Sequence, residues 1–262
     1  MKDTPKLVLR TSVIMLILGL ALLAFGLVAD AHGWWEGHEF ATNVASSATS
    51  LCFGVPAALL VFSHLGQAQE EAREKTHART QVVESTAEFE ATLLDPFDAV
   101  DLAHLRSELR QLSQSLQSTK DASLDDSARE ERITDFLRQL QALLPRVGSQ
   151  HPYRNLRAAQ HDRETWAAMR RWQTRVASQS RILDQEVRPR LVATKSPWLT
   201  TSQASDILQA TRWLFMEGRN PWKAGPRRDA NESVSGAAMK YFLDDVTELC
   251  SGVIALKALY PQ

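Results

Sequence analysis

Two long apolar runs without charged residues lie near the amino terminus of this 262-residue chain. The first, TSVIMLILGLALLAFGLV, covers residues 11–28. With the apolar residues from position 7 onward it reaches the ~20 residues that a helix needs to cross a hydrocarbon core. The second run covers about 40–62 and also lacks Asp, Glu, Lys and Arg. The sequence therefore predicts a transmembrane hairpin, 1–65, with spans at about 7–28 and 40–62 and a short loop at 30–39.

A cleaved signal peptide is the alternative for the first run. Lys2, Lys6 and Arg10 would form its basic region, and the Ala-Asp-Ala stretch at 29–31 resembles a small-x-small cleavage site. However, the apolar run is longer than a usual signal core, and a second one follows after about ten residues. Both features favour an uncleaved helix.

The basic residues predict how the hairpin is oriented. Three Lys or Arg residues lie in the first ten positions, none lies in the loop 30–39, and three more lie between residues 73 and 79. Short cytoplasmic flanks are the ones enriched in Lys and Arg. We therefore expect a multi-pass protein of an inner or plasma membrane, with both termini cytoplasmic and the short loop outside.

Small and polar residues form a stripe on each predicted span. On a helical wheel the stripe of the second span falls within roughly 100° of arc, and that of the first span recurs at seven-residue spacing. Such residues allow transmembrane helices to approach closely and to hydrogen-bond, so we expect them to pack within or between protomers. An alternative is that the second stripe lines a narrow aqueous path, although it carries no charge of the kind an ion-selective pore uses. The predicted packing residues are Ser12, Gly19, Gly26, Asn43, Ser46, Ser47, Ser50 and Gly54.

The rest of the chain reads as helical throughout. Glycines are few after residue 66, and apolar residues recur at three- and four-residue steps without β-type alternation. The fold class expected is all-α: the membrane hairpin, a helical stalk over 66–94, and an α-helical cytoplasmic bundle over 95–262. Within this bundle the pattern predicts helices at about 162–187, 202–217 and 233–259, the last of them at its centre.

A leucine heptad is the clearest periodic feature of the predicted bundle. Its leucines step 3-4-3-4, as in a coiled-coil seam, for about two heptads. The partner is either the next predicted helix, in an antiparallel hairpin, or a second copy of the chain. The seam residues are Leu102, Leu105, Leu109, Leu112 and Leu116.

Charge is distributed unevenly along the chain. Residues 66–145 hold 9 Lys/Arg and 16 Asp/Glu, net −7, whereas residues 146–228 hold 16 and 6, net +10. Either the acidic and basic regions face each other, or the basic region binds an anion such as an anionic lipid or a small anionic ligand. A nucleic-acid partner is disfavoured, because stacking on bases needs exposed rings and most tryptophans are expected in the core. The candidate anion-binding residues are Arg219, Lys223, Arg227 and Arg228.

No motif in the sequence carries recognisable chemistry. Walker, GxGxxG, HExxH, GxSxG and kinase signatures are all missing. The two cysteines are far apart and are expected to be buried apolar residues, and the His/Glu residues of the loop 30–39 are expected to be solvated. The acidic run at 244–248 is expected to form a solvated face or to pair with arginines. We therefore expect no enzyme activity, no cofactor and no metal site.

Together these patterns favour a non-enzymatic, membrane-anchored scaffold or sensor that self-associates, with the lipid bilayer and further copies of itself as partners. The alternative is a ligand- or partner-gated membrane effector, which forms a pore or perturbs the membrane under the control of a cytoplasmic helical domain.

Overall fold

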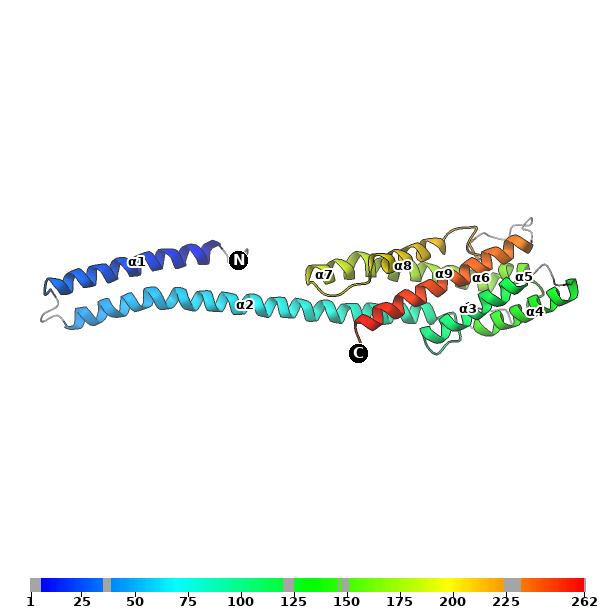
Figure 1. Ribbon diagram of the computed structural model, residues 1–262, viewed down its shortest axis with the longest axis horizontal. Helices are drawn as coiled ribbons and strands as arrows, with labels where there is room; N and C mark the ends of the chain where they lie inside the picture. Colours follow the sequence, from blue (N-terminus) through cyan, green and yellow to red (C-terminus); the bar gives the residue numbers. More distant parts are fainter. Residues whose placement is uncertain are drawn as a thin grey trace. The chain divides into compact units, whose positions relative to one another are not determined.

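The computed structural model describes residues 6–34, 39–119, 125–145, 147, 151–223 and 232–261, and over these residues every regular element is helical (Figure 1). The all-α prediction is confirmed. The chain divides into two compact units, residues 1–74 and residues 75–262, and α2 contributes to both. The elements are α1 (Lys6–Ala31), α2 (Glu39–Leu94), α3 (Leu102–Ser118), α4 (Asp126–Leu143), α5 (Leu156–His161), α6 (Arg163–Ile182), the π-helix η1 (Leu183–Val187), α7 (Arg188–Ala193), α8 (Thr201–Trp213) and α9 (Glu232–Leu259).

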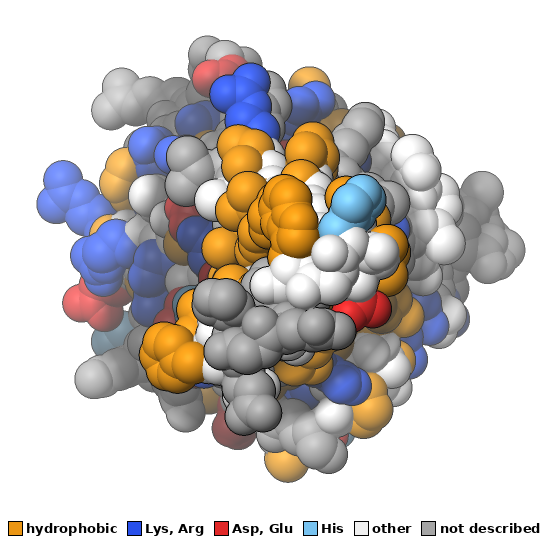
Figure 2. Space-filling view, turned by 90° about the vertical axis from the view of Figure 1, so that its left-hand side faces the viewer, with side chains coloured by type: hydrophobic (Ala, Val, Ile, Leu, Met, Phe, Trp, Pro, Cys, Tyr) orange, Lys and Arg blue, Asp and Glu red, His pale blue; other side chains and the backbone are white. Residues whose placement is uncertain are grey.

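The first unit contains α1 and the first part of α2. Among the described residues these are the two helices long and apolar enough to cross a membrane. Their large apolar side chains stay exposed: Ile14, Ile17 and Leu27 keep 64%, 62% and 66% of their surface accessible. Hydrophobic side chains also gather on the end of this unit that faces the viewer in Figure 2.

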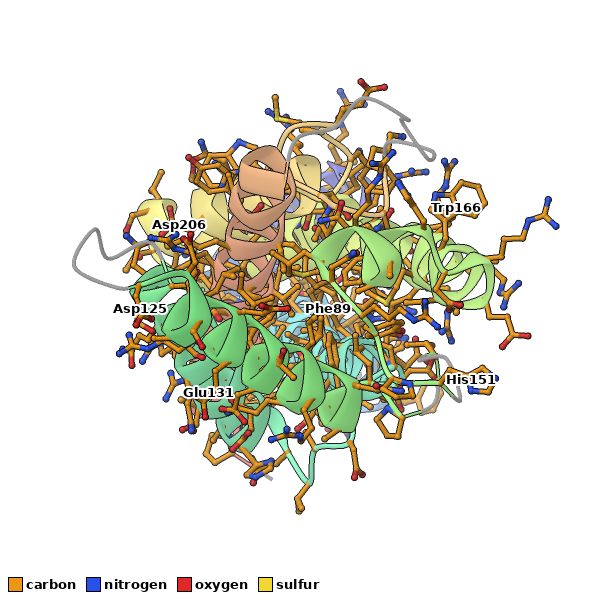
Figure 3. The ribbon with its side chains drawn as sticks, turned by 90° about the vertical axis from the view of Figure 1, so that its right-hand side faces the viewer. Phe89, Asp125, Glu131, His151, Trp166 and Asp206 are labelled. Atoms are coloured by element: carbon orange, nitrogen blue, oxygen red, sulfur yellow. The ribbon has the colours of Figure 1, made fainter. Side chains whose placement is uncertain are left out.

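The carboxyl-terminal part of α2 belongs to the core of the second unit. Ala78, Val82, Phe89 and Leu93 are buried there, and Phe89 lies at the centre of the packed helices (Figure 3). The segment 66–94, expected from sequence to be a stalk, is thus helical throughout, but its later turns supply core side chains.

Helix α3 packs against α9 over an extended interface in the second unit. The five seam leucines of α3 are all buried inside this chain, where α3 also contacts α4. Asp101 and Asp125 cap the amino termini of α3 and α4 by accepting hydrogen bonds from backbone N–H groups, as short acidic residues commonly do.

Helix α9 packs against α3, α5 and α8 and presents its predicted apolar stripe to the core. At Gly252 the approach to α8 is so close that a Cβ atom would come within 2.3 Å of the Cγ1 atom of Ile207. The stripe residues are all buried and comprise Ala238, Phe242, Val246, Leu249, Val253 and Leu256.

The long helix expected at 162–187 runs further than its pattern suggested, through α6, η1 and α7 to Ala193. Pro189 has no N–H to donate within the first turn of α7. The π-turn immediately before it accommodates this missing hydrogen bond, and such bulges are a usual response to an irregular ladder.

Candidate functional site

A seam along α1 marks the contact between the two apolar helices. Residues that are buried or half-buried on α1 recur in 3-4-3-4-3 steps, the spacing of a left-handed helix pair. The seam consists of Ser12, Met15, Gly19, Leu22, Gly26 and Ala29. It includes all three residues predicted to pack on the first span.

Gly19 is the point of closest approach between α1 and α2. A Cβ atom at this position would lie 2.9 Å from the Cβ atom of Cys52 and 3.1 Å from the ring of Phe53. Gly19 therefore permits the contact through its missing side chain. Further along, Leu22 and Gly26 share a groove of about 500 Å³ with earlier α2 residues, including Thr49. Because the contacts run in opposite directions along the two helices, α1 and α2 are antiparallel.

The other predicted small residues of α1 have less crowded surroundings. Nothing lies within 4 Å of a Cβ atom built on Gly26. Ser12 is buried, and its hydroxyl has no hydrogen-bond partner among the described residues.

The centre of the predicted stripe on α2 points away from α1. Between residues 43 and 57 the α1-facing side of α2 is marked by its buried or half-buried positions, which are Ala45, Ala48, Thr49, Cys52, Phe53, Val55 and Pro56. At 100° per residue the centre of the predicted stripe lies about 150° away from that side. The stripe residues Asn43, Ser46, Ser47, Ser50 and Gly54 are all exposed. Two of them, Ser46 and Ser50, also line the groove to which Leu22 and Gly26 of α1 contribute. The structure therefore uses the stripe of α1 within the chain, whereas the stripe of α2 stays exposed and only its edge at Ser46 and Ser50 borders α1.

Arg219, the first of the candidate anion-binding residues, is engaged inside the second unit. Its Nη2 and Nε atoms donate hydrogen bonds of 2.6 and 3.2 Å to the carboxylate of Asp245 on α9. Its guanidinium also stacks over the rings of Trp213 at 3.7 Å and Tyr241 at 4.6 Å. The side chain of Asp245 is only 2% exposed. Burial raises the pKa of Asp245, and the hydrogen bonds and charge of Arg219 oppose that rise.

The turn that follows Arg219 is anchored in the core. The side chain of Asn220 donates to the carbonyl of Leu214 and accepts from the N–H of Trp222, so it holds the chain where α8 has ended. Trp222 is fully buried and packs edge-on against Phe242 at 4.8 Å. The sequence predicted that this helix ends near residue 217. In the structure α8 ends at Trp213, because the turn held by Asn220 follows it.

The remaining candidate anion-binding residues do not form a described cluster. The ammonium of Lys223 lies 5.4 Å from the ring centroid of Phe215, while Arg227 and Arg228 lie outside the described residues. The anion-binding set predicted from sequence thus stays a prediction for Lys223, Arg227 and Arg228.

No known family model matches the chain. The searches of curated proteins and of solved structures also find no match.

Among the described residues, no group of three or more His, Cys, Asp or Glu side chains is placed to hold a metal ion. His32, in the loop between the two apolar helices, lies 2.8 Å through Nδ1 from the carbonyl of Val28, whereas Glu36 and His38 lie outside the described residues. Both cysteines are free and buried.

The acidic run on α9 contacts other side chains. Asp244 pairs with Lys240 at 2.6 Å and accepts a hydrogen bond from the hydroxyl of Ser113. Two residues of the acidic run, Asp244 and Asp245, are therefore paired with cations.

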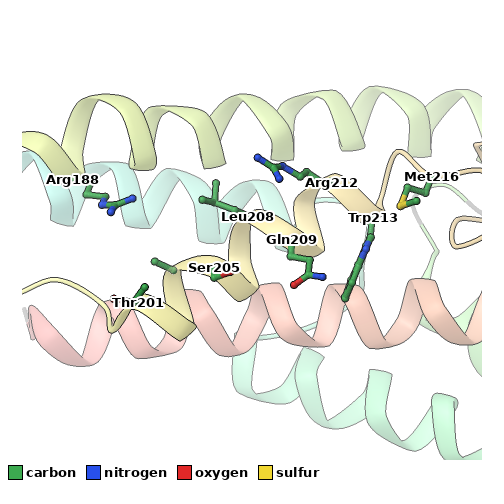
Figure 4. A pocket seen from close by; sticks show the side chains of 9 residues that line it. Arg188, Thr201, Ser205, Leu208, Gln209, Arg212, Trp213 and Met216 are labelled. Atoms are coloured by element: carbon green, nitrogen blue, oxygen red, sulfur yellow. The ribbon is translucent and has the colours of Figure 1, made fainter.

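A groove of about 510 Å³ is lined mainly by residues of α8, together with Arg188 of α7 and Met216 after α8 (Figure 4). Arg188 and Arg212 contribute the positive charge of its lining, and Trp213 and Met216 contribute apolar surface. Arg188 is bound to Asp184 at 2.9 Å. The groove therefore presents one engaged arginine and one that extends from the end of α8.

Sequence reasoning missed the partner of Arg219 and the anchoring role of Asn220. The arginine and its carboxylate are 26 positions apart on different elements, so no helical spacing links them. For Asn220 the available signal was the Asn-Pro dipeptide, which is typical of a turn.

Proposed function

We propose that this chain is a non-enzymatic membrane-anchored scaffold or sensor that self-associates, with α1 and the first part of α2 as a two-span anchor and a helical bundle in the cytoplasm. The observation that carries the proposal is the exposure of α1. Ten of its large apolar side chains remain exposed although one face is packed on α2.

Exposure of these apolar side chains to water is energetically unfavourable. Full burial of one large apolar side chain contributes about 1.5–3 kcal/mol, so half-exposed side chains gain about 1 kcal/mol each on transfer to hydrocarbon. Ten of them supply on the order of 10 kcal/mol. The basic residues before α1 and after the apolar part of α2, with no Lys or Arg in the loop between, support cytoplasmic termini.

Self-association follows from the uncovered stripe on α2. Hydroxyl and amide groups that face hydrocarbon lack the partners that water would provide, and small residues permit a close approach of another helix. The centre of the stripe lies about 150° away from the α1-facing side, so α1 borders only its edge at Ser46 and Ser50. A second copy that presents the same stripe satisfies both requirements.

Membrane insertion and orientation are tested with single cysteines. The background variant carries Cys52→Ser and Cys250→Ala. In this background Trp34→Cys should react with an impermeant maleimide from outside the cell. Lys75→Cys should react only after lysis. The protein should resist carbonate extraction with its amino terminus intact. A mature chain that begins after Ala31, or a protein extracted by carbonate, would refute the anchor.

Self-association is tested by counting subunits of the detergent-purified protein by light scattering. Ser46→Leu/Ser50→Leu should lower the count, because the added bulk separates the stripes. The control Val44→Leu/Leu51→Phe adds bulk about 100° away on the same helix and should leave the count unchanged. A monomeric wild type, or equal effects of the two pairs, would count against the proposal.

The exposed polar stripe also favours a second function, a ligand- or partner-gated effector in which stripes from several copies surround an aqueous path. Dye leakage from liposomes separates the two functions. A scaffold leaves the membrane intact in the wild type and in Ser46→Leu/Ser50→Leu, whereas an effector gives leakage that these substitutions abolish.

A further inference from the structure

A cavity of about 420 Å³ lies in the second unit where α5 meets α6. It is lined by Gln160 and His161 at the end of α5 and by Arg163, Trp166 and Ala167 on the first turns of α6. Figure 3 shows Trp166 at the outer edge of the unit, far from the central Phe89. A small molecule can therefore reach this region from the surface.

Polar atoms buried at this cavity lack partners. Neither Nδ1 nor Nε2 of His161 has a hydrogen-bond partner among the described residues, and the same holds for Nε1 of Trp166. An indole N–H can only donate, and an imidazole carries at least one N–H in every protonation state. At least two buried donors therefore face no acceptor, and a buried donor without an acceptor is costly.

The surroundings of these donors are positively charged. Arg163 lines the cavity, and the guanidinium of Arg170 lies 5.1 Å from the ring centroid of Trp166. Burial lowers the pKa of His161, and the charge of Arg157 lowers it further. The adjacent carboxylate of Asp162 is engaged, because it accepts hydrogen bonds from the N–H and the hydroxyl of Thr165.

From this arrangement we infer that the α5–α6 cavity is a binding site for a phosphate group, carried by a small ligand or by a lipid headgroup. Arg163 supplies a charged guanidinium, and His161 and Trp166 line the same cavity. Their N–H groups are buried without acceptors, and they supply donors when these side chains turn toward the ligand. A phosphate offers three terminal oxygens and up to two negative charges, which suits several donors and several cations better than one carboxylate does. The cavity volume falls within the usual range for small-molecule sites.

The basic segment of the chain supports an external anion. Arg175 and Arg219 of residues 146–228 form ion pairs with Asp95 and Asp245 of other segments. Arg163 makes no described hydrogen bond or ion pair. The described residues of this segment hold 13 Lys/Arg and 6 Asp/Glu, a net charge of +7, which favours the binding of an anion.

The site goes beyond the proposed anchor and self-association, because it uses only residues of the second unit. The test is a titration of the full chain in phosphatidylcholine nanodiscs, with ¹⁵N-labelled indoles observed by NMR. The probes are inorganic phosphate, glycerol 3-phosphate, and nanodiscs that contain phosphatidic acid. The indole signal of Trp166 should move downfield, as expected for an N–H that acquires an anionic acceptor. That of Trp198, whose buried Nε1 also lacks a partner, should stay in place.

Arg163→Gln should weaken binding at least tenfold. The matched control Arg181→Gln removes the same charge from an exposed position of α6 and should change affinity less than twofold. Trp166→Phe keeps a ring of similar character and should weaken binding by losing the N–H, and far-ultraviolet circular dichroism checks that each variant folds. A response to the soluble probes identifies a free phosphate compound, and a response to phosphatidic acid alone identifies a headgroup. No movement of the Trp166 signal with any probe, or equal weakening by Arg163→Gln and Arg181→Gln, overturns the inference.

Discussion

Removal of the Arg219 guanidinium tests how the second unit handles its most deeply buried charge. Arg219→Met keeps an apolar stem over the neighbouring rings but removes both hydrogen bonds to Asp245, of 2.6 and 3.2 Å. Loss of one partner from a buried ion pair costs about 3–5 kcal/mol, because the other charge remains without compensation. The lost stacking on Trp213 and Tyr241 adds about 0.5–1 kcal/mol. Because the side chain of Arg219 is 25% exposed, water can solvate the carboxylate of Asp245 in the variant and offset part of these costs. We therefore expect a loss of about 3–4 kcal/mol in unfolding free energy.

The assay is urea unfolding of the full chain in mild detergent, followed by tryptophan fluorescence. Urea is uncharged and leaves ion pairs unscreened. Asp245→Asn alone should cost about 1–3 kcal/mol. The double variant should cost less than the sum of the single variants by about 2 kcal/mol or more, because neither charge then stays buried alone.

The pH dependence of the unfolding free energy provides an independent test of the buried pair. Burial raises the pKa of Asp245 above its ordinary value of 3.8, so the folded protein holds this proton more tightly than the unfolded chain. The resulting stability is fully present below 3.8 and is lost as pH rises through the folded pKa. Without Arg219 the folded pKa of Asp245 rises further. The deficit of Arg219→Met relative to wild type should therefore grow from about pH 4 to pH 7.

The control is Arg188→Met, which breaks the pair with Asp184 at 2.9 Å, where the side chains are 47% and 30% exposed. Such a pair contributes about 0–1 kcal/mol. If Arg219→Met costs no more than Arg188→Met, or if its deficit shrinks as pH rises, the reasoning about the buried pair is wrong.

Three further predictions concern close packing and buried thiols. Gly252→Ala should lower the unfolding free energy in the same urea assay by about 1–2 kcal/mol, since its Cβ atom would overlap an α8 side chain. The control Gly236→Ala would make only an ordinary contact at 3.7 Å and should be neutral or stabilising. Gly19→Ala should separate α1 from α2 and speed maleimide labelling of Cys52 in micelles; an unchanged rate would mean that the helices do not meet there. Burial raises the pKa of Cys250 to about 12, so between about pH 7 and pH 9 its labelling should require unfolding, and rapid native labelling would contradict its burial.

Sequence periodicity predicted the helices and most of their buried faces for a local reason. Within one helix, side-chain direction repeats every 3.6 residues, so an apolar stripe is visible before any partner is known. The seam from Leu102 to Leu116 and the stripe of α9 were found in this way and are buried. Where the ladder is irregular, as at Pro189, the same reasoning placed the helix end several residues too early.

Contacts between distant segments were beyond such reasoning. Asp245 lies within an acidic run that reads equally well as a solvated face, and only the turn held by Asn220 brings Arg219 to it. The α5–α6 cavity depends likewise on a change of direction at Asp162, which ends α5 and caps α6. The sequence shows that His161 and Trp166 are near each other, but it does not show that their nitrogens lack partners.

The choice of face on α2 follows from how a glycine works between helices. One residue without a side chain is sufficient for a close approach, and the opposite residue can then be larger, as Phe53 is opposite Gly19. The small residues of α1 therefore do not need the small residues of α2. If Asn43, Ser47 and Ser50 lie in a bilayer, they face lipid tails unless another helix or water covers them. The exposed part of the α2 stripe is therefore the surface that a second copy would cover in our proposal, and the subunit count of Ser46→Leu/Ser50→Leu measures whether it does.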